Sequence, residues 1–439
     1  MSWRKVRLGD VLTESKIICE NPNADRRIKV RLKVLGVEKR GLENEIEGAT
    51  KQFIRKAGQF IYGKQNFHKG AFGIIPKELD GFESSSDLPA FDVSKECLPE
   101  WIFYFFKQGN YYLELSKIAR GVATQRIHPD QIFDLKIPLP DIKTQTQFLL
   151  NIKSIENRGC ELSTELNYQQ DLLTQVRQSF LKEAMQGKLV KQDQTDGNAT
   201  DLLKKIKTDK LKSGKKEKEL PPIKEEEIPF TIPKNWAWCR LGEIAANIEY
   251  GTSQKAEMSS EHIPVLRMNN IQDGKIDYEK LKYVQSSIDD LPKLYLKEGD
   301  LLFNRTNSYE LVGKSGVYHG DDDVMTFASY LIRVQFSKNI STDFVNHYIN
   351  SSFCRKTQLE PEIIQQNGQA NFNGTKLKNI ICPLPPLAEQ NRIVKKLKEI
   401  INLCEELKAT IRDNQNHADQ FLQVALKDAL QPKAIQALI

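Results

Sequence analysis

A heptad pattern occurs twice in this chain, in the same register both times. From Phe148 to Phe180, mostly apolar residues recur at alternating steps of four and three positions, and the run from Ile393 to Ala425 repeats these steps 245 positions later. A spacing that averages about 3.5 residues keeps one stripe aligned only when a helix winds around a partner helix. The chain is therefore predicted to contain two long helices that form a coiled coil.

The predicted stripes define which side chains should be buried between the helices. They comprise Ile152, Ile155, Gly159, Leu162, Leu166, Gln169, Leu173 and Val176 in the first helix, and Leu397, Ile400, Cys404, Leu407, Ile411, Asn414, Ala418 and Phe421 in the second. Gly159, Gln169 and Asn414 are weak seam residues. They either fix the register at a cost in stability or mark where a partner subunit packs.

Other motifs repeat at the same offset. Pro138–Pro140 and Pro383–Pro385 both read Pro-Leu-Pro, and Gln145 and Gln390 follow them at the same distance. Chance rarely aligns a proline motif, a glutamine and a heptad register at one offset. We therefore interpret the chain as an internal duplication.

The duplication divides the chain into five segments. They are a globular domain at 1–140, a spacer helix within 141–190, a charged linker at 191–233, a second globular domain at 234–383 and a second spacer helix within 384–439. Gly187 is expected to stop the first helix, and Pro432 the second. The domains themselves match only loosely, as when Arg240–Glu243 echoes Arg7–Asp10, so loop residues have been gained and lost while the helices kept their register.

Local patterns predict several shorter elements. Val30–Val37 and Gln59–Tyr62 are expected to be strands, and a helix is expected to place Trp101, Tyr104 and Phe105 on one buried face.

The linker has a distinct composition. Asp201–Lys207 is expected to form a short helix, and the remainder is expected to be a charged tether with little to bury. Its lysine-rich run either contacts phosphates or is a solvated tether, and composition favours the tether.

Charge and cysteine content limit the class of protein. The 439 residues carry a net charge of +6, which fits either ordinary basic solubility or a positive face that binds nucleic acid. The seven cysteines include no Cys-x-x-Cys pair, which favours reduced thiols in a cytoplasmic protein. No apolar run reaches the roughly 20 residues of a membrane span, and the N-terminal residues resemble no signal peptide. We expect no membrane association.

The sequence lacks the common catalytic motifs. It contains no Asn/Asp-Pro-Pro-aromatic loop of an adenine methyltransferase, no Gly-x-Gly cofactor turn after a strand, no P-loop and no paired histidines at metal-ligand spacing. We therefore expect neither a catalytic site nor a bound metal or cofactor in this chain.

Polar loops recur where strand-like segments end. They offer arginine for guanine edges, amides for adenine edges and hydroxyls or lysines for phosphates. The alternative is that these residues only build turns; the set as a whole favours nucleic-acid binding. The candidate DNA-binding residues are Lys64, Asn66, His68, Lys69, Arg120, Gln125 and Arg126 in the first domain, and Thr252, Ser253, Lys255, Arg267, Asn269, Asn304, Arg305, Asn307, Lys314, Gln369 and Asn371 in the second.

Three motifs together resemble the specificity subunit of type I restriction–modification systems. They are Pro229–Ile244, which contains Pro-Phe-Thr-Ile-Pro and Trp-Ala-Trp-Cys-Arg-Leu-Gly-Glu, Pro383–Gln390, and Phe180–Val190. The resemblance covers nearly the whole chain and is stronger in the second domain than in the first, where 69–91 departs from the usual pattern.

This resemblance implies an α+β fold class. It consists of two globular α+β target-recognition domains in a pseudo-two-fold repeat, separated by two long antiparallel coiled-coil helices. The antiparallel arrangement follows from the resemblance, because the linker is long enough for either geometry.

The resemblance also implies a function. The chain would be a non-catalytic subunit that reads a bipartite, asymmetric site in double-stranded DNA. It would dock two methyltransferase subunits and the restriction subunits, which carry S-adenosylmethionine, ATP and magnesium. A different class of protein remains open, namely a coiled-coil scaffold with two protein-binding domains.

Overall fold

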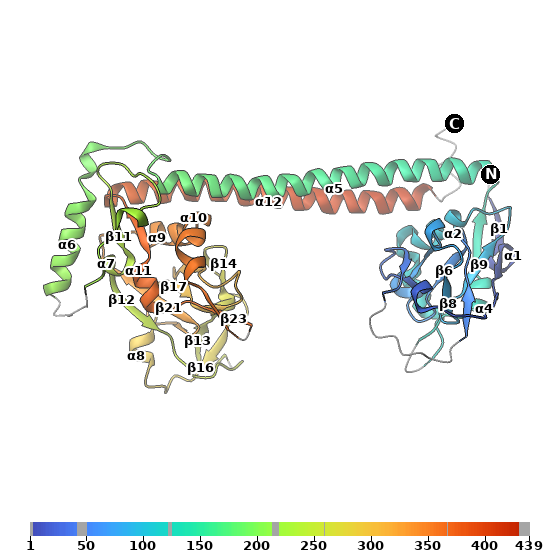
Figure 1. Cartoon of the computed structure of the whole chain (residues 1–439), viewed down its shortest axis with the longest axis horizontal. Helices are drawn as coiled ribbons and strands as arrows, with labels where there is room; N and C mark the ends of the chain where they lie inside the picture. Colours follow the sequence, from blue (N-terminus) through green and yellow to red (C-terminus); the bar gives the residue numbers. More distant parts are fainter. Residues whose placement is uncertain are drawn as a thin grey trace. The chain divides into compact units, whose positions relative to one another are not determined.

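The chain forms two compact units in a computed structural model, which describes residues 3–41, 51–121, 125–212, 219–258, 260–366 and 368–429. The first unit comprises Met1–Tyr168 and Ile411–Ile439, and the second comprises Gln169–Thr410. Each unit contains one globular domain and a section of both long helices, α5 (Ile142–Met185) and α12 (Leu387–Ala429) (Figure 1). No helix among the described residues combines the length and the apolar character required to cross a lipid bilayer.

The first domain is built from short strands and helices. Its strands are β1 (Arg4–Arg7), β2 (Leu12–Glu14), β3 (Ile28–Val30), β4 (Val37–Lys39), β5 (Gln52–Ile54), β6 (Phe60–Tyr62), β7 (Phe72–Ile74), β8 (Glu83–Ser85), β9 (Ala90–Val93) and β10 (Lys136–Leu139), and its helices are α1 (Leu8–Val11), α2 (Pro99–Lys107), α3 (Tyr111–Glu114) and α4 (Pro129–Phe133). A four-stranded sheet runs β2-β9-β6-β7. Its core is aromatic, and Phe60, Phe91 and Trp101 are fully buried.

The second domain is larger. Its strands are β11 (Ala237–Arg240), β12 (Ala245–Tyr250), β13 (Ile263–Leu266), β14 (Ile271–Gln272), β15 (Lys275–Ile276), β16 (Lys282–Val284), β17 (Leu301–Asn304), β18 (Thr306–Asn307), β19 (Ser315–Val317), β20 (Thr326–Phe327), β21 (Leu331–Phe336), β22 (Ile364–Gln366), β23 (Gln369–Asn371) and β24 (Ile381–Leu384). Its helices are α6 (Ala199–Lys212), α7 (Leu241–Ile244), α8 (Leu291–Leu294), α9 (Thr342–Ile349), α10 (Ser352–Cys354) and α11 (Gly374–Asn379). The main sheet runs β12-β21-β17-β19, and a smaller one runs β18-β23-β22.

Both domains follow one plan, which confirms the predicted α+β fold class with two long helices. In each, the first strand pairs antiparallel with the last, β1 with β10 and β11 with β24. A one-turn helix follows the first strand, α1 or α7. A four-stranded sheet comes next, and the last strand leads through a Pro-Leu-Pro motif into a long helix.

A buried glutamine joins each domain to its long helix. The Gln390 Oε1 accepts the backbone N–H of Ser341 at 2.8 Å, and its Nε2 donates to the carbonyl of Pro385 at 2.9 Å. The Gln145 Oε1 accepts the N–H of Leu98 at 2.8 Å, and its Nε2 donates to the carbonyl of Pro140 at 2.8 Å. Ser341 and Leu98 are the residues that precede α9 and α2. The equivalence expected from the 245-residue offset therefore extends to hydrogen bonds.

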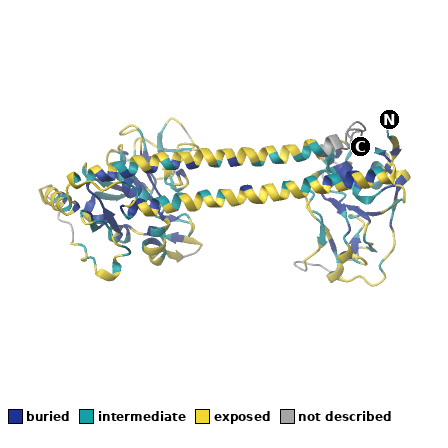
Figure 2. Cartoon of the chain, turned by 90° about the horizontal axis from the view of Figure 1, so that it is seen from above, coloured by how far each residue is buried: buried dark blue, intermediate teal, exposed yellow. Residues whose placement is uncertain are grey.

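The long helices run antiparallel within each unit. In the first unit, Gln415 donates to Asn167 at 3.0 Å, and Leu422 packs on the domain core that the start of α5 covers. In the second, Arg177 pairs with Glu405 at 3.7 Å. Much of both helices is exposed, as the yellow ribbon in Figure 2 shows.

The buried stripe of each helix differs from the predicted one at several alternate positions, while Ile155 and Ile400 are half-buried as predicted. In α12, Leu397, Cys404 and Ile411 are buried as predicted. Ile401 is also buried, at 6% exposed, whereas the predicted Leu407 is 46% exposed. The observed stripe runs through Leu397, Ile401, Cys404, Lys408, Ile411, Gln415, Ala418 and Leu422, and the predicted Phe421 is 68% exposed. Helix α5 shows the same shift, because Leu162 and Val176 are exposed while Glu156 and Arg177 are half-buried.

The shift arises because each helix packs on its domain as well as on the other helix. Glu156 accepts hydrogen bonds from the hydroxyl of Tyr104 and the ammonium of Lys107, both at 2.6 Å. Arg177 donates to the carbonyl of Asp273 at 3.0 Å. A polar side chain can occupy a seam position when a domain supplies its hydrogen-bond partner. The heptad pattern of the helix does not predict that partner.

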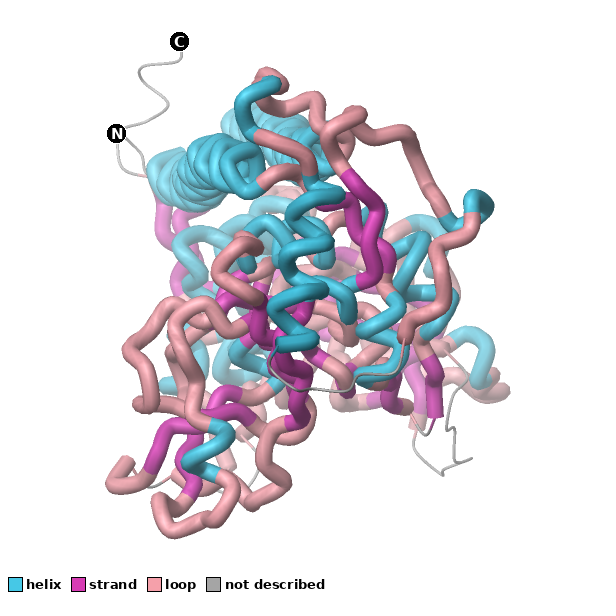
Figure 3. Tube along the Cα trace, turned by 90° about the vertical axis from the view of Figure 1, so that its left-hand side faces the viewer, coloured by secondary structure: helices cyan, strands magenta, loops and turns pink. Residues whose placement is uncertain are grey.

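The charged linker is more ordered than predicted. Helix α6 is longer than the expected Asp201–Lys207 and lies against the second domain (Figure 3). There Lys210 donates to the carbonyl of Gly242 at 2.8 Å. The Arg240 guanidinium, which is almost fully buried, bonds the carbonyl of Pro221 at 2.7 Å and the carboxylate of Glu227 at 3.0 Å. The described part of the linker therefore supplies the partners of a buried arginine.

Smaller expectations had mixed outcomes. Gln59–Tyr62 overlaps β6, and α2 buries Trp101, Tyr104 and Phe105 as expected. Gly187 ends α5 with a φ of 69°, in the left-handed conformation that favours glycine. The expected strand Val30–Val37 is wrong: a turn replaces its middle and makes the β3–β4 hairpin. Pro432 lies outside the described residues.

The glutamine joints lead to a stability prediction. Gln390→Leu should lower the free energy of unfolding of the second unit by about 1–3 kcal/mol, because the N–H of Ser341 and the carbonyl of Pro385 lose their buried partner. Urea denaturation monitored by tryptophan fluorescence measures the change. The neighbouring exposed Asn391 provides the matched control, Asn391→Leu. Equal losses of stability in the two variants would show that the hydrogen bonds of Gln390 do not stabilise the unit.

The observed seam predicts a second pair of variants. Ile401→Ala should cost about 2–5 kcal/mol, as for other buried isoleucines, whereas Leu407→Ala should cost about 0.5 kcal/mol or less, as for an exposed side chain. The same denaturation experiment compares them. The register drawn from the sequence alone predicts the reverse order.

Candidate nucleic-acid interface

Three polar loops of the second domain meet at one place. They are the segment after β12, the segment that joins β17 to β18, and β23 with its flanking residues. The backbone N–H of Phe372 donates to the carbonyl of Arg305 at 2.9 Å, and the N–H of Gly374 donates to the hydroxyl of Tyr250 at 2.8 Å. Gly251 allows the closest approach, since a Cβ there would lie 2.3 Å from the carbonyl oxygen of Phe327. The predicted loops are thus brought together by one backbone hydrogen bond and one bond from the backbone to a tyrosine hydroxyl.

Arg305 occupies the centre of this cluster. Its guanidinium carbon lies 4.9 Å from the centroid of the Tyr250 ring, and its Nη1 donates to the carbonyl of Ser329 at 3.3 Å. Tyr250 and Tyr330 are each 45% exposed. Stacking and one carbonyl bond fix the plane of the guanidinium. Its Nε is buried, so the N–H groups left on its two Nη atoms form the pre-oriented donors.

A second pair in the cluster joins Thr306 to Asn371. The Thr306 hydroxyl donates to the Asn371 Oδ1 at 2.9 Å, across the pairing of β18 with β23. Gln369 is exposed at the end of β23, and Asn307 is half-buried, with its Oδ1 accepting the N–H of Ser308 at 2.8 Å. This small sheet therefore presents an exposed amide, Gln369, beside the paired Thr306 and Asn371.

Two of the predicted contact residues are buried inside the domain. Asn304 is 1% exposed, and its Nδ2 donates to the carbonyl of Met268 at 3.3 Å. Thr252 is also buried, and its hydroxyl donates to the carboxylate of Asp290 at 3.4 Å. Their side chains hold neighbouring segments together, whereas the adjacent Ser253 is exposed.

The remaining candidates of this domain lie around the cluster. Lys255 and Asn269 are exposed. Arg267 is half-buried, and its Nη2 donates to the carbonyl of Lys280 at 3.5 Å. Lys314 is half-buried and lines a cleft next to α5.

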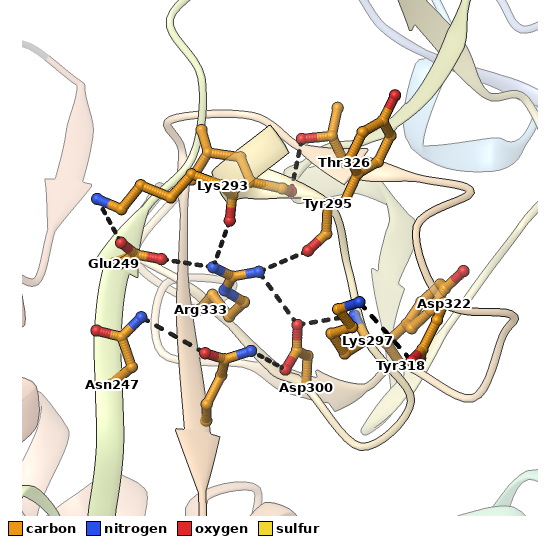
Figure 4. Close-up of polar contacts among 12 residues, drawn as sticks. Asn247, Glu249, Lys293, Tyr295, Lys297, Asp300, Tyr318, Asp322, Thr326 and Arg333 are labelled. Atoms are coloured by element: carbon orange, nitrogen blue, oxygen red, sulfur yellow. Dashed lines mark hydrogen bonds and ion pairs between the residues drawn. The ribbon is translucent and has the colours of Figure 1, made fainter. Parts of the chain in front are cut away.

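A buried arginine supports this region and was not singled out in the sequence. The Arg333 guanidinium bonds the carboxylate of Asp300 at 3.3 Å and that of Glu249 at 2.5 Å (Figure 4). It also donates to the carbonyls of Tyr295 and Lys293, at 2.7 Å and 3.0 Å. These bonds tie α8 to the main sheet. The signal in the sequence is one arginine inside the apolar strand β21, which no periodic pattern distinguishes from a surface residue.

The two carboxylates respond differently to Arg333. Burial raises the pKa of Asp300, although the N–H of Lys297 and the side chains of Gln335 and Arg333 oppose the rise. Burial acts to raise the pKa of Glu249 as well, but the hydrogen bonds from Lys293 and Arg333 outweigh it, so this pKa lies below its usual value. Arg333 therefore neutralises a pair of acids that would otherwise destabilise the domain.

The candidate loops of the first domain also meet. The N–H of Ile127 donates to the carbonyl of Lys64 at 2.9 Å, and Arg120 and Arg126 exchange two backbone hydrogen bonds of 2.8 Å. The N–H of Lys33, in the β3–β4 turn, donates to the carbonyl of Lys69 at 2.9 Å. The sequence did not single out this turn.

Side chains in these loops differ in how free they are. Arg120 pairs with Asp130 at 2.8 Å, and Arg126 lies 3.8 Å from Asp87; both pairs are substantially exposed. Lys69 and Gln125 are exposed, and Lys64, Asn66 and His68 are half-buried. Burial, reinforced by the charge of Lys69, lowers the pKa of His68, so its ring is neutral at pH 7. Residues 122–124 of the predicted loop lie outside the described residues.

The arrangement suits recognition of polar edges. Forked or paired donors and acceptors on arginine and amide side chains match the hydrogen-bonding edges of base pairs, and lysines match phosphates. The cluster of the second domain combines a fixed guanidinium with exposed amides and two exposed aromatic rings.

Known proteins resemble this chain in sequence. Residues 233–414 match the family described as type I restriction modification DNA specificity domain. The EcoAI specificity subunit of an Escherichia coli type I restriction enzyme is 31% identical over 59% of this chain, and the match spans only 44% of that relative's length. The MjaVIII specificity subunit of Methanocaldococcus jannaschii is 25% identical, over 92% of this chain and 87% of the relative.

A solved structure shares the fold of the whole chain. It describes complex assembly and conformational transition of the type I R-M system, and one of its chains aligns over 98% of both chains with a TM-score of 0.69 at 18% identity. The family match covers the second domain and the beginning of α12. In sequence the chain is similar to specificity subunits of type I restriction enzymes, and it spans less than half the length of the EcoAI subunit.

The Arg333 network yields a testable prediction. Arg333→Gln should lower the free energy of unfolding of the second unit by about 3–5 kcal/mol. The buried carboxylate of Asp300 loses its counter-charge, and Glu249 keeps only that of Lys293. Adding Asp300→Asn should recover part of that loss, since it removes one uncompensated charge. Denaturation curves of the single and double variants measure both effects, with the exposed Lys338→Gln as control. If the two substitutions lower the free energy of unfolding additively, Arg333 and Asp300 do not interact as described.

Proposed function

We propose that this chain is a non-catalytic subunit that reads a bipartite, asymmetric site in double-stranded DNA. The observation that supports this most directly is that one domain plan occurs twice with different loops. Both domains keep the same paired strands and the same buried glutamine, whereas the candidate contact loops differ in sequence and length. Two domains of one plan with different contact residues suit two different half-sites.

The long helices suit a spacer role in this proposal. A continuous helix rises about 1.5 Å per residue, so α5 and α12 are long enough to set the separation of two readers. Half-sites read from one face of a duplex fall about one helical turn, roughly 10 bp, apart. The length of DNA left unread would then depend on the helices and not on the loops.

The chemistry would be supplied by partners. We propose that the chain docks two methyltransferase subunits and the restriction subunits of a type I system in the cytoplasm. S-adenosylmethionine, ATP and magnesium would be bound by those subunits. Exposed apolar residues on the long helices, among them Leu162, Leu407 and Phe421, are available for such docking.

Domain exchange tests the proposal. Residues 1–140 are replaced by the equivalent domain of a related chain with a known site, and methylated adenines are mapped in cells that express either form with the partner subunits. One half-site should change while the other half-site and the gap stay the same. A change in both half-sites, or in neither, would refute the modular reading of DNA.

Arg305 provides the prediction at residue level. Arg305→Ala should reduce discrimination at one base pair of the second half-site by about 1–3 kcal/mol, because a bidentate contact is lost. Binding to a set of duplexes with single substitutions measures it. The exposed Lys338→Ala is the control and should leave discrimination unchanged. An equal loss of affinity for all sequences would show that Arg305 contacts a phosphate and not a base.

A salt series separates this function from that of a scaffold that binds proteins only. Phosphate contacts release counterions, so the logarithm of the binding constant should fall linearly with the logarithm of the salt concentration. A scaffold should show no binding to random duplex at any salt concentration.

A further inference from the structure

A cleft lies beside the reading loops of the second domain. It has a volume of about 380 Å³ and is lined by side chains of α5, α12, the β14–β15 hairpin, the segment before β19, and α9 with the residues after it. All of these belong to the second unit. The candidate contact residue Lys314 is part of its wall, and none of the other residues assigned to DNA reading lines it.

The cleft wall is rich in cations. Five basic side chains line it, Arg177, Lys275, Lys314, Arg355 and Lys408, against two acidic ones, Asp273 and Glu310. The two arginines are neutralised by glutamates outside the wall, because Arg177 pairs with Glu405 and Arg355 with Glu360. Within the described residues, no carboxylate lies at ion-pair distance from the three lysines. Their ammonium groups are therefore available to an anion.

The lysines are presented by anchored backbone. Lys275 follows a tight turn in which Asp273 and Gly274 have φ values of 48° and 83°. Arg177 holds this turn through the carbonyl of Asp273 at 3.0 Å, and Asn346 holds it through the carbonyl of Gly274 at 2.8 Å. The hairpin is thus fixed to both α5 and α9, which reduces the entropy lost when an anion binds.

The cleft adjoins the reading loops through one short segment. The N–H of Asn304 donates to the carbonyl of Lys314 at 2.8 Å, and Arg305 is the next residue along the chain. Arg355 bonds the carbonyls of Tyr309 and Val312, at 2.5 Å and 2.8 Å, and so braces the segment between Arg305 and Lys314. A duplex read by Arg305 would therefore carry its backbone past Lys314.

We propose that this cleft binds a phosphate of the DNA backbone just outside the second half-site, through the ammonium groups of Lys275, Lys314 and Lys408. The proposal rests on the proposed function, because it places the cleft next to a half-site that the same domain reads. Such a contact carries no base information. It orients the unread DNA beside the long helices and adds affinity that is equal for all sequences.

The main experiment compares the full-length wild-type chain with the triple variant Lys275→Ala/Lys314→Ala/Lys408→Ala. Each phosphate contact contributes about 0.9 to the magnitude of the slope of log K against log salt. The variant loses one such contact, so the magnitude of its slope should fall by about 0.9. Its discrimination between single-substitution duplexes should stay as in wild type. An unchanged slope would overturn the proposal. Lys338→Ala/Lys356→Ala, which removes two exposed lysines outside the cleft wall, is the control and should keep the wild-type slope.

A second measurement locates the phosphate and tests a free anion as the source. The wild-type chain should bind a duplex that ends at the half-site more weakly than one extended into the gap, and the triple variant should bind the two alike. If the variant loses binding of inorganic tripolyphosphate but keeps the gain from extended DNA, the cleft serves a free anion and the proposal fails. Failure of the proposed function is distinct, because the wild-type chain itself would then prefer no sequence.

Discussion

The structure depends on a buried amide at the base of each long helix. Gln145 and Gln390 are fully inaccessible to water, so their amide groups must find partners inside the protein. Each finds one in the backbone before a domain helix and one in the Pro-Leu-Pro turn that opens the long helix. This fixes, within each unit, how the long helix leaves the domain. The same joint occurs twice because the segment that carries it was duplicated.

From this joint outward, side chains divide into those that hold the domain together and those that face solvent. Arg240 and Arg333 are buried cations whose many bonds tie a linker and a short helix to the sheet framework. Asn304 and Thr252 lie in the predicted contact loops, but their side chains form hydrogen bonds inside the domain. Arg305, the exposed amides and the lysines are left to meet a ligand. Rigid support beneath a few outward-facing groups is what selective recognition of base edges requires.

The fold was largely predictable from the sequence, and the fine geometry was not. The duplication, the two long helices, the end of the first near Gly187, and α2 all followed from periodicity, proline motifs and glycine. The seam register failed at alternate positions, because the partners of Glu156 and Arg177 come from globular domains remote in sequence. The linker was misjudged for a similar reason. Its charge suggested a solvated tether, while Arg240 required its carbonyls and Glu227 as buried partners.

The sequence by itself determined that this protein contains an internal duplication, because a repeated offset between motifs is visible in the sequence alone. It also determined which residue types stand in the loops. Only the tertiary structure decided which of those side chains are buried, which loops meet around Arg305, and that three lysines from separate elements share one cleft. The physical reason is that burial and proximity depend on contacts between segments far apart in the chain, and local periodicity reports only which side of an element a residue occupies.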